Sequence, residues 1–82
     1  MEKRIGVIAI LIHQHEQIPA LNRMLSEYGE IILGRMGLPL KDRDVSVISL
    51  IIEGDTDQIG ALTGRIGRLD GITVKSVLTP KK

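Results

Sequence analysis

The chain contains two stretches that are apolar at almost every position. They are residues 4–13, RIGVIAILIH, and residues 45–53, VSVISLIIE. A strand with one face in water alternates apolar and polar side chains, whereas a strand that is apolar on both faces must be covered on both faces. We therefore predict that both stretches are central strands of a sheet that is covered on each side.

Two further stretches have the spacing of an amphipathic helix. Apolar residues recur at intervals of three and four in residues 18–28 and again in residues 59–69. This spacing places them on one face of each helix, which we expect to pack on the sheet. The residues concerned are Ile18, Leu21, Leu25 and Tyr28 in the first stretch, and Ile59, Leu62, Ile66 and Leu69 in the second.

The ends of both helices carry recognisable signals. Pro19 suits a first helical turn, because its missing N–H has no partner there in any case. Gly29 and Gly71 suit the positions just after a helix. Asp55 and Gln58 have the spacing of a capping box, which predicts that the second helix begins directly after Asp55.

Two weaker strands complete the chain. Residues 31–38 form a strand that contains two glycines, residues 38–44 form a charged loop, and residues 72–78 form an alternating edge strand. The order strand–helix–strand, strand–helix–strand is that of the ferredoxin-like βαββαβ fold, with its first and third strands central. We predict one α+β domain over residues 1–82, with a four-stranded antiparallel sheet, two helices on one face, and residues 80–82 as a tail.

This fold leaves one face of the sheet without cover from the chain itself. Hydrophobic residues make up 43% of the sequence and aromatic residues only 1%, so a small aliphatic domain must hide much apolar surface. We expect a second copy of the chain to cover the free face, giving a dimer or tetramer. The candidate interface residues are Ile8, Ile10 and Ile12 in the first strand, Arg35 in the second, and Gly60, Gly64 and Gly67 along one stripe of the second helix.

Composition excludes several functions. A net charge of +1 gives no electrostatic footprint for nucleic acid, and no cysteine is present to form disulfides or thiolate metal sites. The apolar run in residues 5–12 is too short to span a bilayer. We expect a soluble cytoplasmic protein without a cofactor, without membrane attachment and without direct contact to DNA or RNA.

Polar residues that could bind a ligand gather after the first strand. They are His13, Gln14, His15, Glu16 and Gln17. If the strand continued, His13 and His15 would share a face and could chelate Ni or Zn, with a neighbouring subunit completing the site. A small enzyme that uses His15 and Glu16 as acid and base is the least favoured interpretation, and we assign no catalytic residue.

The sequence resembles the ACT-like regulatory domains, and more closely a small family of regulators of iron-only hydrogenase systems. The resemblance covers nearly the whole chain and is carried by residues 29–39 (GEIILGRMGLP), 45–49 (VSVIS), 60–67 (GALTGRIG) and 74–76 (VKS). The family is related in fold to the sensor domain of the nickel-responsive repressor. That relation implies a tetramer built by packing sheets, with effector sites between subunits.

The chain departs from these relatives at three points. The first strand begins near residue 4, so we expect no DNA-binding segment before it. Only His13 and His15 are available as nickel ligands, and Pro19-Ala20 stands where ACT domains usually carry Pro-Gly. We therefore expect a non-enzymatic regulatory or ligand-sensing module that acts as a homo-oligomer and reaches DNA through a partner protein. A Ni or Zn protein is the alternative.

Overall fold

The strands and helices occur in the predicted order, joined in part by two short 3₁₀ turns. The computed structural model describes residues 2–80. Its elements are β1 (Arg4–Ile12), η1 (His15–Gln17), α1 (Ile18–Glu27), β2 (Ile32–Leu40), η2 (Lys41–Arg43), β3 (Val45–Gly54), α2 (Thr56–Gly67) and β4 (Ile72–Leu78). Lys81 and Lys82 of the predicted tail lie outside the described residues.

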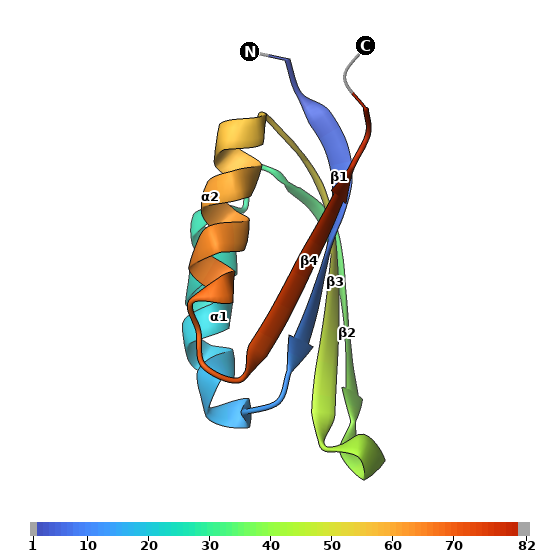
Figure 1. Cartoon of the computed structure of the whole chain (residues 1–82), viewed down its shortest axis with the longest axis vertical. Helices are drawn as coiled ribbons and strands as arrows, with labels where there is room; N and C mark the ends of the chain where they lie inside the picture. Colours follow the sequence, from blue (N-terminus) through green and yellow to red (C-terminus); the bar gives the residue numbers. More distant parts are fainter. Residues whose placement is uncertain (1, 81–82) are drawn as a thin grey trace.

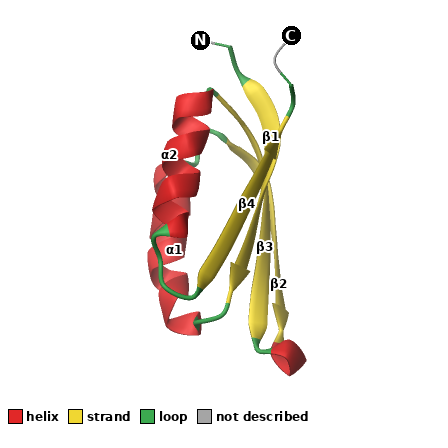
Figure 2. Ribbon diagram, viewed as in Figure 1, coloured by secondary structure: helices red, strands yellow, loops and turns green. Residues whose placement is uncertain are grey.

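All four strands belong to one antiparallel sheet with the order β2-β3-β1-β4. Figures 1 and 2 show α1 and α2 side by side over one face of this sheet, while no described element lies over the other face. The predicted α+β ferredoxin-like fold is confirmed. The two central strands are β1 and β3, as their apolar composition indicated.

The core lies between the sheet and the helices and consists of isoleucine and leucine. Its members are Ile8, Ile10, Ile12, Leu21, Leu25, Ile31, Ile48, Leu50, Ile52, Ile59, Leu62 and Ile66. The helix stripes predicted from the sequence supply Leu21, Leu25, Ile59, Leu62 and Ile66, and β1 and β3 supply most of the remainder.

The prediction that Ile8, Ile10 and Ile12 face the uncovered side of the sheet is wrong. All three are completely buried beneath the helices. The neighbouring residues Ile5 and Val7 face the uncovered side instead, with 49% and 43% of their surface exposed. Alternate strand residues point to opposite faces, and both faces of β1 are aliphatic, so the side chains alone did not reveal which face the helices would cover.

Local signals determine most element boundaries. The Asp55–Gln58 capping box is present: Gln58 N–H donates to Asp55 Oδ1 at 2.8 Å, and Asp55 N–H donates to Gln58 Oε1 at 3.1 Å. Gly71 has a φ of +69°, which favours glycine at the turn into β4. Strand β2 continues through Pro39, two residues further than expected, which an edge strand can accommodate.

Candidate functional site

The face of the sheet opposite the helices carries exposed apolar side chains on all four strands, and we call it the open face. Cross-strand pairing arranges most of its side chains in three rows, each read from β2 through β3 and β1 to β4, and Ile5 with the exposed Glu53 lies beyond the first row. The rows are Gly34–Ile51–Val7–Val77, Met36–Ser49–Ala9–Lys75, and Leu38–Val47–Leu11–Thr73. The middle row is the least bulky at its centre, because Ser49 and Ala9 are both small.

The most exposed apolar residues of the open face lie at its two edges. Met36 on β2 is 73% exposed and Val77 on β4 is 72% exposed. A hollow of about 330 Å³ lies at the β2 edge and is lined by Gly34, Arg35, Met36, Ser49 and Ile51. An added Cβ at Gly34 would meet no atom within 4 Å, so this edge of the face has room for another side chain. Exposed apolar residues grouped in this way indicate an interaction surface.

The polar loop after β1 is held in place by neighbouring elements. His13 N–H donates to the Gly71 carbonyl oxygen at 2.7 Å. The Gln14 side chain lies so close to Gly71 that a Cβ there would be 2.5 Å from Gln14 Cγ. The His15 Nε2 and Ser46 Oγ atoms are 3.3 Å apart, and Ser46 is almost fully buried. The loop thus contacts β3 and the turn before β4, and Glu16 remains exposed.

The structure does not support the predicted metal-binding geometry. Strand β1 ends at Ile12, and His15 belongs to the η1 turn, so the condition that both histidines extend one strand face is not met. Within residues 2–80 no group of three or more histidine, aspartate or glutamate residues is arranged to hold a metal ion. Ser46, the contact of His15, was not identified from the sequence, since nothing local relates residues 15 and 46.

The other predicted interface residues occupy different surfaces. Arg35 lies on the helix side of β2, where its guanidinium donates to Asn22 Oδ1 of α1 at 3.1 Å. Gly60 and Gly64 face open space, and a Cβ at Gly67 would contact Val74 at 3.5 Å. The three glycines of α2 do not belong to the open face, whereas Arg35 also lines the hollow at its β2 edge. Residues on that face, such as Ile51, could have been found by choosing the other set of alternate residues in each central strand.

The outer surface of the helices carries an ion pair. Arg65 Nη2 lies 3.1 Å from Glu27 Oε2, and the guanidinium carbon lies 5.6 Å from the centre of the Tyr28 ring. The pKa of Arg65 is raised, chiefly by its hydrogen bonds to Glu27 and then by Tyr28. An open hollow of about 470 Å³ beside this pair is lined by residues that include Arg23 and Met24. Because both partners are exposed, this pair adds little to stability.

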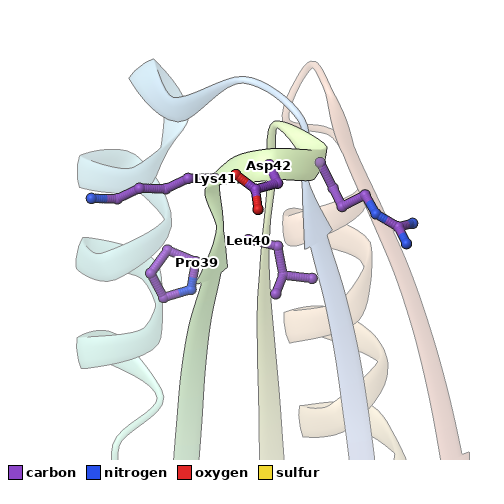
Figure 3. Close-up of a pocket in the computed structure, with 5 residues that line it drawn as sticks. Pro39, Leu40, Lys41 and Asp42 are labelled. Carbon is purple, nitrogen blue, oxygen red and sulfur yellow. The ribbon is translucent and has the colours of Figure 1, made fainter.

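The turn between β2 and β3 forms another hollow, of about 420 Å³, at the far end of the hairpin. It is lined by Pro39, Leu40, Lys41, Asp42 and Arg43. In Figure 3 the Lys41 side chain extends away from Asp42, so these two charged groups do not converge on one point. Asp44 closes the turn with a φ of 54°. The mixed charges and the divergent side chains give this hollow no defined ligand chemistry.

No helix within residues 2–80 has the length and apolar character needed to cross a membrane.

No match is found among curated proteins. The profile of the TM1266-like family, described as "Iron-only hydrogenase system regulator, putative", matches residues 4–76.

Solved structures confirm the fold. The uncharacterized protein TM1266 from Thermotoga maritima is 32% identical, with a TM-score of 0.91, over 96% of this chain and 100% of that protein. CPII from Thiomonas intermedia K12, a nitrogen regulatory PII-like protein, is 12% identical with a TM-score of 0.52, over 98% and 100% of the two chains. CutA1 from Ehrlichia chaffeensis is 13% identical with a TM-score of 0.50, over 100% and 87%.

The last two similarities are too distant to show more than a shared fold. The family profile covers nearly the whole described chain, and the Thermotoga protein superimposes over almost its full length. The profile match includes both central strands, both helices and the open-face residues up to Lys75. The chain therefore belongs to the TM1266-like family of iron-only hydrogenase system regulators.

Proposed function

We propose that this protein is a non-enzymatic regulatory module of an iron-only hydrogenase system, that it acts as a homo-oligomer, and that it senses a small molecule. The open face is the observation that carries this proposal. Eight large apolar side chains of the described chain are more than a third exposed, and most of them lie on that face. A chain of 82 residues gains little from such surface unless another molecule covers it.

The loop that follows β1 supports the sensing part of the proposal. His13, Gln14, His15, Glu16 and Gln17 lie at the end of the central strand β1, next to the turn that contains Gly71. An effector that contacts this loop would act directly on the ends of β1 and β3. The PII-like relative CPII was solved bound to ADP, AMP and bicarbonate, so small ligands are compatible with this fold.

Catalysis receives no support from the described residues. The His15–Ser46 contact is the one pair that resembles a nucleophile and its base, but Ser46 is nearly inaccessible. No carboxylate within residues 2–80 accepts a hydrogen bond from His15 to orient its ring, as a triad would require. A regulatory function that depends on binding fits this arrangement better than group transfer.

The proposed regulation of transcription requires a separate DNA-binding protein. Both helices are packed on the sheet, and a net charge of +1 gives little overall attraction for the phosphates of a duplex. A ligand that binds one assembly state more tightly than another would shift the population toward that state. The partner would then respond to the change in assembly.

Native mass spectrometry tests the oligomer and the effector together. Protein purified from its own cells should appear as a dimer or tetramer that carries an additional small mass. A Glu16→Ala variant should lose that mass, whereas Glu30→Ala, an exposed glutamate just before β2, should keep it. Assemblies without any added mass, together with unchanged hydrogenase transcripts in cells that lack this protein, would contradict the proposal.

A further inference from the structure

We propose that the open face packs against the open face of a second copy of this chain. The two copies are related by a two-fold axis that lies between the stacked sheets, runs parallel to the strands, and passes over the gap between β1 and β3. The inference rests on the homo-oligomeric part of the proposed function and specifies the surface and its arrangement. It follows from the order of large, small and charged side chains in the three rows of the open face.

An axis in this direction keeps every residue in its row and reverses the order of the strands. Strand β2 then lies opposite β4 of the second copy, and β3 lies opposite β1 of the second copy, because the sheet order is β2-β3-β1-β4. The contact is isologous, so each pairing occurs twice and the two open faces form a closed pair.

The first row has a large exposed side chain at one edge and a hollow at the other. Val77 lies at the β4 edge, where it is 72% exposed. Gly34 occupies the same row at the β2 edge, next to the hollow of about 330 Å³. The proposed axis places Val77 of the second copy over this hollow. Aligned sheets cross at about 30°, which displaces edge residues by about one residue spacing, and the hollow extends from Gly34 to Ser49.

The middle row allows the two sheets to approach closely. Ser49 of one copy meets Ala9 of the other at its centre, and both side chains are small. Larger side chains flank this row on both sides, Ile51 and Val7 in one row and Val47 and Leu11 in the other. Interdigitation of large and small side chains is how stacked sheets fill the space of about 10 Å between them.

Lys75 distinguishes this arrangement from its main alternative. It is the one charged residue of the three rows, and the proposed axis places it opposite Met36 at the margin of the interface. There its methylene stem can pack on the methionine while the ammonium reaches solvent. A two-fold axis perpendicular to the strands would instead bring Lys75 against Lys75 of the second copy, and like charges facing each other oppose association.

Sedimentation equilibrium of two glycine variants tests the proposal. Gly34→Val fills the hollow and should raise the dissociation constant of the assembly by at least about tenfold. Gly37→Val is the matched control on the same strand, on the helix side, and should leave the constant unchanged. Both variants should fold, since an added Cβ meets nothing within 4 Å at Gly34 and only Ile48 Cγ1, at 3.9 Å, at Gly37.

Cysteine cross-linking tests the direction of the axis, because the natural chain contains no cysteine. A mixture of Gly34→Cys and Val77→Cys chains should give a disulfide-linked dimer, and neither variant should do so alone. Efficient self-cross-linking of Met36→Cys would show an axis perpendicular to the strands and would overturn the inference.

The outcomes separate this inference from the proposed function. An oligomer whose dissociation constant is insensitive to Gly34→Val would overturn the inference and leave the proposed homo-oligomeric regulator standing. A wild-type protein that remains monomeric at micromolar concentration would overturn both.

Discussion

The two faces of the sheet are built from the same strands and nearly the same side chains, yet they have opposite environments. On the helix face, Ile8, Ile10 and Leu50 are completely buried. On the open face, Val7 and Ile51 are 43% and 50% exposed. Aliphatic character therefore does not decide burial here. What decides it is which face the two helices cover, and the second face keeps enough apolar surface for another molecule.

The faces also differ in how evenly they are filled. The helix face is packed continuously with isoleucine and leucine from both helices and both central strands. The open face alternates large residues with a glycine, a serine and an alanine, Gly34, Ser49 and Ala9. A protein interior is packed uniformly, whereas an interface between two subunits is complementary when large side chains of one subunit fill gaps in the other.

The largest contrast should come from adjacent residues of β3 that point to opposite faces. Leu50→Ala removes a fully buried side chain and should lower the free energy of unfolding by about 2–5 kcal/mol. Ile51→Ala should lower it by about 1 kcal/mol or less when measured on the monomer. Urea denaturation at low protein concentration gives both values, and equal losses would show that the two faces are not energetically distinct.

A charge placed on the open face should disrupt assembly without disrupting the fold. Val7→Lys puts an ammonium in the middle of that face and should weaken self-association by at least about tenfold, as measured by light scattering after gel filtration. Ser76→Lys, an exposed position on the helix side of β4, is the matched control. Unchanged assembly in Val7→Lys, or equal weakening by both variants, would argue against the open face as the interface.

The packing of the helix face depends on the capping box that stabilises the first turn of α2. Asp55→Ala removes the side chain that accepts the Gln58 N–H and should reduce stability by about 1 kcal/mol. Asp57→Ala, also in the first turn, removes only a favourable charge and should cost less. Thermal denaturation compares the two, and the reverse order would show that the capping box contributes little.

The smallest effect should be a gain in stability on the outer surface of α2. Gly60→Ala and Gly64→Ala should each raise the free energy of unfolding by up to about 1 kcal/mol, because both positions face open space. Gly71→Ala should do the opposite, since Gly71 has a φ of +69° and Gln14 occupies the space of a Cβ. A loss of stability in Gly60→Ala would indicate that this surface is packed against another molecule.

Local patterns were sufficient to predict the order of the four strands and two helices. The spacing of Leu21 and Leu25, and of Leu62 and Ile66, identified the buried side of each helix, and Asp55 with Gln58 identified the start of α2. These signals act within one or two helical turns, so they can be read directly from the chain. The end of β2 was predicted two residues too early, because Pro39 ends a central strand but can remain in an edge strand.

The candidate sites depended on contacts that join distant parts of the chain. Nothing near His15 indicates that it lies 3.3 Å from Ser46, and nothing near Arg35 indicates that it donates to Asn22 on α1. The geometry assumed for the metal hypothesis is not met within one chain, since β1 ends at Ile12 and the two histidines do not continue one strand face. Such relations follow from how the elements pack.

The sequence by itself determined the elements, their order and hence the ferredoxin-like topology, because periodicity and capping are local and the handedness of crossovers is general. Only the tertiary structure decided which residues of the central strands face the helices. Both faces of β1 and β3 are aliphatic, so either phase would have given an apolar core. The packing of α1 and α2 selected Ile8, Ile10 and Ile12 for the interior and left Ile5, Val7 and Leu11 on the open face.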